Sequence, residues 1–310
     1  MSNTLSTVSW VTVSGFGADI RTTKDTLIIS ERANTRYYPL NEVSHLVICG
    51  GHSLQTSALA ALRARNIPVT FFDARGKVVG TLSDEKKPGL AERQRSLSVQ
   101  KFALSVISAS MDARMLFLHE LDDKKPEGIF YRGELEILTK SRSELAYLVT
   151  MQEFSRVFSL NRNMYYEILA RAVPRELGFR RFAESGPYSD PVSVLFSLGY
   201  AVLYAQGAAA CTGSGLDLDC GALFSKTGAC VYDIIEAAKP SMVDRVVLGM
   251  AAEGALSGKF ETGPRCIIAD EVMTEFYRRL KAGVNRTVLE ENVRRYADAV
   301  KGICAPEFHY

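Results

Sequence analysis

The hydrophobic pattern of the chain changes once, near residue 83, and this change constrains the fold more than any other feature. Before it, short stretches rich in β-branched and aromatic residues lie between residues 9 and 51, with turn signals at Gly15–Gly17 and Thr23–Asp25. A helical pattern follows at residues 54–65, and two further strand patterns come after it. These spacings predict a small β-sheet with one helix.

Residues 83–89 are polar and charged and contain a Pro-Gly pair, which predicts a domain boundary. Beyond them, apolar residues recur at helical spacing, first in residues 97–121 and then in one long stretch from about residue 141 to 172. We therefore predict an α+β fold. A small N-terminal β-rich domain, residues 1–84, is joined to a larger all-α C-terminal domain, residues 85–310.

The most apolar helix pattern lies at residues 191–210. Ser189 or Asp190 is expected to cap this helix, with Pro191 in its first turn. Because almost all of its residues are apolar or small, we expect it to form the buried centre of the helical domain.

The composition is that of an ordinary globular protein. Of the 310 residues, 47% are apolar and 23% are charged, which argues against a disordered chain. The formal charge of +2 neither requires nor excludes a nucleic-acid partner, because such binding depends on where basic residues gather. The N-terminal residues lack the pattern of a signal peptide, and we find no run of eighteen apolar residues, so we expect a cytoplasmic protein without a membrane partner.

Histidine and cysteine form no recognisable metal or redox motif. The six cysteines occur singly and never as a C-x-x-C pair, which argues against a zinc ribbon or a thioredoxin-like site. His45 and His52 lie in the predicted sheet domain without a matching carboxylate or nucleophile. We interpret them as structural histidines whose hydrogen bonds are satisfied by the backbone.

Asp233 and Glu236 are the main candidates for metal ligands. They lie three residues apart at the end of an apolar run, and Pro240 is expected to stop a short helix there, so both carboxylates can face the same way. Such a pair suits a hard divalent ion, Mg²⁺ or Mn²⁺, which needs further ligands from elsewhere in the chain. The alternative is that the pair only caps a helix and interacts with its dipole.

Basic residues gather in two places that could contact a phosphate backbone. Arg171, Arg180 and Arg181 flank a proline-containing loop, and Lys239 and Arg245 lie beside the acidic pair. These five residues are our candidates for DNA binding. A solvated helix face is the alternative interpretation.

Several motifs, taken in order, resemble those of one known family. Residues 40–82 resemble its sheet, helix and glycine-bounded last strands, and residues 165–182 followed by 189–204 resemble its Tyr-Phe helix, linking loop and D-P-V-N helix. Residues 215–224 and 233–240 are similar to its G-L-D-P-x-x-G-x-x-H and D-L-x-E-x-x-R-P elements. On these residues the chain resembles the CRISPR-associated integrase and endonuclease that inserts new spacers, the first-numbered protein of that system.

The resemblance implies a fold and a set of partners. It implies a β-rich dimerisation domain in residues 1–84 and a helical domain in residues 85–310 that binds DNA and holds the catalytic site. It also implies a homodimer that assembles with a small ferredoxin-like CRISPR adaptation partner. In the family, one Mn²⁺ or Mg²⁺ ion is held by a glutamate, a histidine and an acidic residue for in-line attack on a phosphodiester.

The implied metal ligands are only partly present in this sequence. The acidic element falls on Asp233 and Glu236, with Lys239 where the family has arginine. The histidine position falls on Phe224 and the glutamate position on Phe158, and a phenyl ring has no lone pair for an ion. The resemblance therefore predicts that no catalytic set is intact.

A few other residues are candidates to replace the missing glutamate and histidine ligands. A register slip of one residue would move the glutamate position to Ser159, which is also a poor ligand. Asp217 and Asp219 lie close in sequence to the histidine position and are candidates to rebuild a site. Glu153 and Glu167 are expected to point away from it, because they lie on other faces of the predicted helix.

Three hypotheses follow. The first is a dimeric DNA-binding protein for spacer acquisition that has a degraded metal site, weak or no nuclease activity, and no required cofactor. The second is an active Mg²⁺- or Mn²⁺-dependent endonuclease and integrase with a rearranged site. The third is a scaffold that uses its apolar surface to engage a protein partner.

Overall fold

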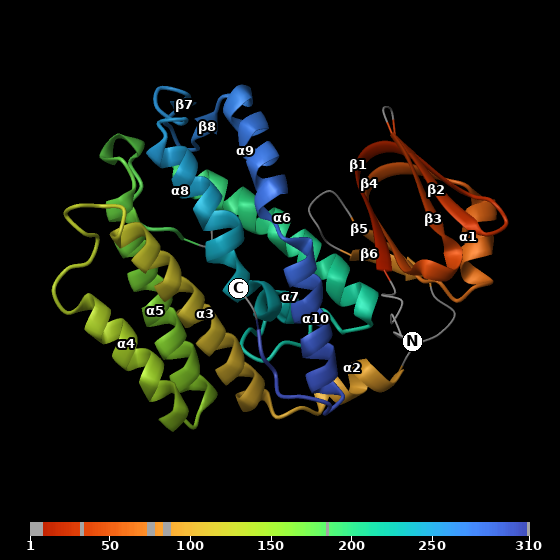
Figure 1. Cartoon of the computed structure of the whole chain (residues 1–310), viewed down its shortest axis with the longest axis horizontal. Helices are drawn as coiled ribbons and strands as arrows, with labels where there is room; N and C mark the ends of the chain where they lie inside the picture. Colours follow the sequence, from red (N-terminus) through yellow and green to blue (C-terminus); the bar gives the residue numbers. More distant parts are fainter. Residues whose placement is uncertain (1–8, 32–33, 73–77, 83–87, 184–185, 309–310) are drawn as a thin grey trace, which may run out of the picture. The chain divides into compact units, whose positions relative to one another are not determined.

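A computed structural model describes residues 9–31, 34–72, 78–82, 88–183 and 186–308 (Figure 1). The chain divides into two compact units. The sheet unit comprises Met1–Arg95 with Ala208–Asp217, and the helical unit comprises Ser96–Gly207 with Leu218–Tyr310. The domain boundary predicted between residues 84 and 85 lies outside the described residues.

The sheet unit contains one mixed six-stranded sheet with the strand order β3-β2-β1-β4-β5-β6. Its central strands β1, β4 and β5 run parallel to one another, and the remaining pairs are antiparallel. Helix α1, which follows β4, adds Leu62 to the aliphatic core of the sheet. The strands are β1 (Ser9–Thr22), β2 (Thr26–Glu31), β3 (Asn34–Pro39), β4 (Val43–Leu54), β5 (Val69–Phe72) and β6 (Val78–Leu82), and α1 is Thr56–Arg63.

The predicted turn at Gly15–Gly17 is wrong, because β1 continues through these residues. Gly15 and Gly17 have φ angles of 102° and 80°, and the pairing of β1 with β4 shifts register between Phe16 and Asp19. A glycine pair with positive φ here makes an irregularity within the strand rather than a chain reversal. Gly50 lies opposite Gly15, and a Cβ atom at Gly50 would collide with the Gly15 carbonyl oxygen.

The helical unit is built around α3, which packs against α5 and against the short 3₁₀ turn η4. It confirms the predicted helical region, apart from a small hairpin of β7 and β8. The helices outside α1 are α2 (Pro88–Arg95, in the sheet unit), α3 (Val99–Asp122), α4 (Glu134–Glu144), α5 (Met151–Ala172), α6 (Pro191–Ser214), α7 (Ala229–Ile235), η4 (Glu236–Ala238), α8 (Arg245–Ala252), α9 (Asp270–Gly283) and α10 (Arg286–Val300); the hairpin strands are β7 (Phe260–Glu261) and β8 (Ile267–Ile268).

The long helix predicted from about residue 141 to 172 is interrupted. α4 ends at Glu144, and α5 begins only at Met151. Thr150 accepts a hydrogen bond from the Glu153 backbone N–H, and the Glu153 carboxylate accepts one from the Thr150 N–H at 2.8 Å. This capping box starts a new helix, and its T-x-x-E signal is present in the sequence.

Helix α6 confirms the predicted cap. The Asp190 Oδ1 atom accepts a hydrogen bond from the Ser193 backbone N–H at 2.7 Å, with Pro191 as the first helical residue. Among the described residues, α6 is the one helix long and apolar enough to cross a membrane. Half of its most apolar window is buried, which is less than expected for the buried centre of a domain.

Pro240 does not end the helical path, contrary to expectation. η4 is followed directly by a π-helical turn, Pro240–Asp244, which leads into α8. Proline is tolerated at the first residue of a new helical segment because no partner is needed there for its missing N–H. The succession of α, 3₁₀ and π turns carries Asp233, Glu236 and Asp244 into the interior of the helical unit.

Candidate functional site

Glu236 is bound by two cations inside the helical unit. Its side chain is 1% exposed, and its two oxygens accept hydrogen bonds from Arg114 Nη2 and Lys239 Nζ, each at 2.5 Å. Burial opposes ionisation, but the charges of Lys239 and Arg114 outweigh it and hold the pKa of Glu236 below its ordinary value. The carboxylate is therefore ionised and already neutralised by the protein.

Arg114 of α3 joins three helical segments through one guanidinium group. Besides Glu236 of η4, it donates a hydrogen bond to Asn161 Oδ1 of α5 at 3.0 Å. Its guanidinium carbon lies 5.0 Å from the centroid of the Phe158 ring, a cation–π distance. The sequence analysis missed this residue, although Arg114 continues the helical spacing of Ile107 and Met111 on the buried face of α3.

Asp233 forms hydrogen bonds to a loop, and its carboxylate does not lie with that of Glu236 on one exposed helix face. It is 1% exposed, and its carboxylate accepts backbone N–H groups from Ala222, Leu223 and Phe224 at 2.5 to 3.4 Å. Burial raises the pKa of Asp233 to about 7, because desolvation outweighs these hydrogen bonds. The side chain acts as a cap, as in the alternative interpretation, but it caps the loop that carries Phe224 rather than a helix.

Phe158 and Phe224 lie in contact with each other. Their ring centroids are 5.6 Å apart with an interplanar angle of 86°. Phe158 is buried in an apolar cluster with Ile107 and Met111, and Phe224 packs against that cluster. The structure thus brings together the two ring positions and both carboxylates, with the Arg114 guanidinium between Phe158 and Glu236.

Two further cations lie over these rings. The Arg162 guanidinium carbon is 6.0 Å from the centroid of Phe158. Lys226 Nζ is 5.1 Å from the centroid of Phe224 and 3.7 Å from that of Tyr232. Lys226 is exposed and Arg162 is half-buried.

The arrangement does not fit a divalent ion. Within the described parts of the chain, no group of three or more histidine, cysteine, aspartate or glutamate side chains could hold a metal ion. The Glu236 oxygens face Arg114 and Lys239, whereas Mg²⁺ and Mn²⁺ require several oxygen ligands with free lone pairs.

The candidate replacement ligands are engaged elsewhere. Asp217 forms an ion pair with Arg95 at 2.5 Å within the sheet unit. In the helical unit, Asp219 accepts the Gly228 backbone N–H at 2.6 Å. Of the two glutamates on α5, Glu153 belongs to the capping box and Glu167 lies 3.5 Å from Arg181.

The five candidate DNA-binding residues differ in their surroundings. Arg171 and Arg245 are bound to carboxylates, Arg171 to Glu134 at 2.5 Å and Arg245 to Glu120 at 2.6 Å. Lys239 is bound to the buried Glu236 and Arg181 to Glu167. Arg180 is exposed. These ion pairs reduce the charge that the residues can offer to a phosphate backbone.

Asp244 is a third buried carboxylate, and it was not among the residues predicted from the sequence. It accepts hydrogen bonds from the hydroxyl groups of Tyr165 and Tyr200, each at 2.5 Å. Burial raises its pKa to about 7, although both hydroxyls lower it. The two tyrosines come from α5 and α6, so this carboxylate ties those helices to the π-helical turn.

The histidines of the sheet unit are structural. The Ala18 backbone N–H lies 3.2 Å from His52 Nδ1, and His52 Nε2 lies 3.1 Å from the Cys49 carbonyl oxygen, which confirms the backbone interpretation for His52. His45 Nε2 pairs instead with the Thr70 hydroxyl at 2.9 Å, inside the sheet.

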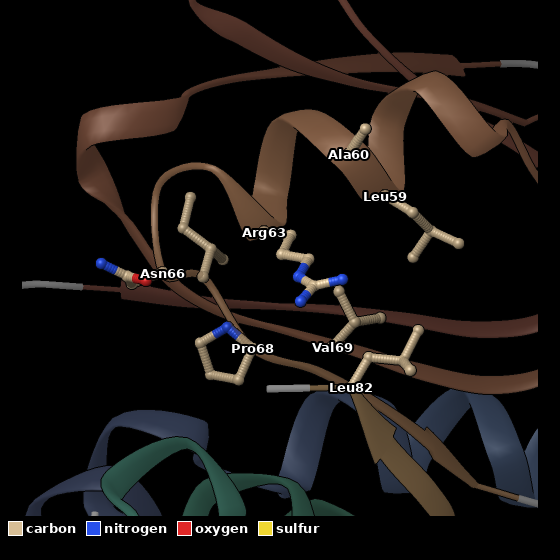
Figure 2. Close-up of a pocket in the computed structure, with 8 residues that line it drawn as sticks. Leu59, Ala60, Arg63, Asn66, Pro68, Val69 and Leu82 are labelled. Atoms are coloured by element: carbon tan, nitrogen blue, oxygen red, sulfur yellow. The ribbon is translucent and has the colours of Figure 1, made fainter. Parts of the chain in front are cut away.

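A cavity of about 460 Å³ lies beside α1 in the sheet unit. Figure 2 shows side chains from α1, the following loop, β5 and β6 around it. The described residues that line it include neither a carboxylate nor a histidine. The lining residues are Leu59, Ala60, Arg63, Asn66, Ile67, Pro68, Val69 and Leu82.

Comparison with known proteins gives consistent matches. Residues 11–282 match the family model described as "CRISPR associated protein Cas1". A protein of Methanospirillum hungatei named "Putative CRISPR-associated endonuclease Cas1 2" is 30% identical over 293 residues, which covers 93% of this chain and 96% of the relative.

Solved structures share the fold. A chain of a "Partial Cas6-RT-Cas1--Cas2 complex" superposes with a TM-score of 0.75 at 17% identity, covering 97% of this chain and 98% of the other. A chain of the "Crystal structure of TtCas1-DNA complex" gives a TM-score of 0.56 at 16% identity, covering 95% and 96%. At these identities the similarity establishes the architecture alone.

Proposed function

Because the chain belongs to the CRISPR-associated Cas1 family, we propose that it binds DNA for spacer acquisition and that its divalent-metal site is degraded, leaving weak or no nuclease activity. DNA binding then needs no divalent ion. The protein works as a homodimer in the cytoplasm, together with a small ferredoxin-like adaptation partner. Two proteins with the same fold support these partners, because one was solved in a Cas6-RT-Cas1--Cas2 complex and the other in a complex with DNA.

One observation carries the proposal. The Glu236 carboxylate, which the family pattern assigns to the metal, is closed in by Arg114 and Lys239 and is 1% exposed. For an ion to bind, both ion pairs must be broken and the charged groups rearranged in a buried environment, where unpaired charges are costly. An ion that binds weakly and from one side is also poorly positioned for catalysis.

The residues of the chain itself bind and orient the DNA without a metal ion. Basic side chains of the helical unit bind phosphate groups. This electrostatic contribution to DNA binding does not depend on the DNA sequence and becomes weaker as the salt concentration rises. The Phe158–Phe224 contact excludes water from the inner side of the site. Without a held ion or an activated water, these groups bind and orient DNA but supply no nucleophile.

The test is DNA binding and cleavage by the full chain, with branched DNA as the probe. We expect a fluorescence anisotropy increase at low salt in EDTA, unchanged when Mn²⁺ replaces EDTA, and no cleavage or strand joining in either buffer. Cleavage that requires Mn²⁺ and disappears in Glu236→Gln would contradict the degraded site. The Gln variant keeps the size of the side chain, and thermal melting shows whether it folds.

An active endonuclease is the competing candidate, favoured by the name of the Methanospirillum hungatei relative. It requires Asp233 and Glu236 to turn toward a shared ion and requires Asp217 or Asp219 to join them. The discriminating result is Mn²⁺-dependent cleavage that is lost in Asp233→Asn and in Asp219→Asn separately. If only the Asp233 variant loses activity, the rebuilt site does not use Asp219.

A further inference from the structure

We propose that Tyr131, supported on one face by the Arg171 guanidinium, is a stacking platform for an unpaired nucleobase of the bound DNA. Tyr131 lies in the loop between α3 and α4, and Arg171 lies in the last turn of α5. The inference rests on the proposed function, because it requires a DNA ligand. It goes beyond that function by naming a form of DNA, one with unpaired bases, and the ring that receives a base.

The Arg171 guanidinium is held in one place by three hydrogen bonds. Nη1 and Nη2 donate to the two carboxylate oxygens of Glu134, at 2.5 and 2.7 Å, and Nη1 also donates to the Ile129 carbonyl oxygen at 2.8 Å. The hydrogen bond from Arg171 lowers the pKa of Glu134, so the pair remains charged at neutral pH. A guanidinium bound along its edge in this way keeps its planar faces available for an aromatic ring.

The Tyr131 ring uses one of those faces. The guanidinium carbon of Arg171 lies 3.6 Å from the ring centroid, and the Tyr131 backbone N–H donates to Glu134 Oε2 at 2.8 Å. Both the ring and the backbone of Tyr131 are therefore fixed to the same ion pair. The residue is nevertheless 67% exposed, so the other face of the ring is open to solvent. A ring already held in position loses little conformational entropy when a ligand stacks on it.

A neutral aromatic base suits the open face better than a second cation. The electron density of the ring attracts cations to its faces, but the charge of Arg171 on one face repels another cation approaching the opposite face. A nucleobase is flat and uncharged, and its stacking on an aromatic side chain tolerates any base because each has a π-face. Bases inside a duplex are stacked on their neighbours, so the ligand is an unpaired base.

The charge of this surface is almost balanced, so stacking rather than electrostatic attraction provides the contact. Residues 122–136 together with Arg171 carry four positive and five negative side chains. The positive ones are Lys124, Lys125, Arg132 and Arg171, and the negative ones are Asp122, Asp123, Glu127, Glu134 and Glu136. Phosphate contacts weaken as salt rises because they release counterions. The contribution of Tyr131 should instead change little with salt concentration.

The experiment compares two fluorescein-labelled DNAs with the full chain in EDTA, a blunt duplex and the same duplex extended by a single-stranded tail. Tyr131→Ala removes the platform, whereas Tyr131→Trp keeps an aromatic face. Tyr147→Ala is the matched control, because Tyr147 of the 3₁₀ turn η2 (Leu145–Tyr147) is 82% exposed and has no cation or aromatic ring over it within the described residues. Fluorescence anisotropy gives Kd over a series of salt concentrations, and thermal melting of each variant verifies its fold.

We expect the wild type to bind the tailed DNA more tightly than the blunt duplex. Tyr131→Ala should weaken binding of the tailed DNA on the order of tenfold, by the same factor at each salt concentration, and should bind the blunt duplex as the wild type does. Tyr131→Trp and Tyr147→Ala should match the wild type on both DNAs.

Three outcomes would contradict the inference, and one of them also removes the proposed function. If the wild type binds both DNAs and Tyr131→Ala binds the tailed DNA with the same affinity, the platform is overturned while DNA binding stands. Equal weakening on both DNAs also overturns it, because the ring then contacts the duplex rather than an unpaired base. If the wild type binds neither DNA at any salt concentration, the proposed function fails, and the platform fails with it.

Discussion

The two units of this protein bury different kinds of side chain. The core of the sheet unit is aliphatic, with Ile20, Leu27 and Ile29 fully buried, and its buried polar contacts include the hydrogen bond between His45 and Thr70. Among the described residues, the buried carboxylates and the buried arginine all belong to the helical unit; they are Arg114, Asp233, Glu236 and Asp244. Burying charge is costly, so such a cluster is retained only where every member is paired.

This difference teaches where sequence patterns are informative. An aliphatic core follows from residue periodicity within each strand, and another aliphatic residue of similar size would serve. A buried ion pair depends on residues far apart in the chain, such as Arg114 and Glu236, and losing one member leaves the other unpaired. The helical unit should therefore be sensitive to single changes and to pH in ways that the sheet unit is not.

The largest expected effect is that of Glu236→Ala. It leaves the Arg114 guanidinium buried without its carboxylate, and we expect the free energy of unfolding to fall by about 3–5 kcal/mol. Urea unfolding followed by circular dichroism measures this loss. The double change Arg114→Met with Glu236→Met should lose clearly less than the single change, because no buried charge from that pair remains. Equal losses would show that packing, not charge, dominates at this place.

The next effect is a pH dependence from Asp244. Its pKa is raised from 3.8 to about 7 in the folded protein, so the folded state holds a proton that the unfolded state has released. The contribution of this group to stability is therefore greatest below about pH 4 and falls as the pH rises toward 7, by roughly 2–4 kcal/mol in all.

Asp244→Asn isolates that contribution. The amide keeps one acceptor for a tyrosine hydroxyl and does not titrate, so the variant should lose less stability than the wild type between pH 4 and pH 7. Urea midpoints measured across this range provide the comparison. Parallel curves for the two proteins would show that Asp244 does not have a raised pKa.

The smallest effect concerns the sheet unit. Ile29→Val removes one methyl group from a fully buried position, and we expect a loss of about 1 kcal/mol. Because no charged group lies in this aliphatic cluster, the loss should be the same at pH 5 and pH 8. A loss that changes with pH would break the distinction between the two units.

Much of the fold followed from sequence patterns. Short stretches rich in β-branched and aromatic residues predicted the strands of the sheet unit, and Asp190 with Pro191 predicted the start of α6. The predictions were wrong where a residue is compatible with two different local structures. Gly15 and Gly17 permit a bulge as well as a turn, Thr150 starts a new helix inside a helical pattern, and Pro240 begins a segment instead of ending one.

The candidate site was predictable in part. The sequence located Asp233, Glu236, Phe158 and Phe224, and the structure places them in one region. It did not reveal that Arg114, about 120 residues before Glu236, is the partner of that carboxylate, because ion pairing across helices leaves no local pattern. The cations over the aromatic rings were missed for the same reason.

The central claim is that protein cations, rather than a metal ion, neutralise Glu236. Electron paramagnetic resonance of free Mn²⁺ tests it directly, because bound ions lose the sharp signal of the hexaaqua ion. We predict that adding the full chain leaves the free Mn²⁺ signal unchanged apart from dilution. Loss of the signal in proportion to the protein, restored by Glu236→Gln, would contradict the account.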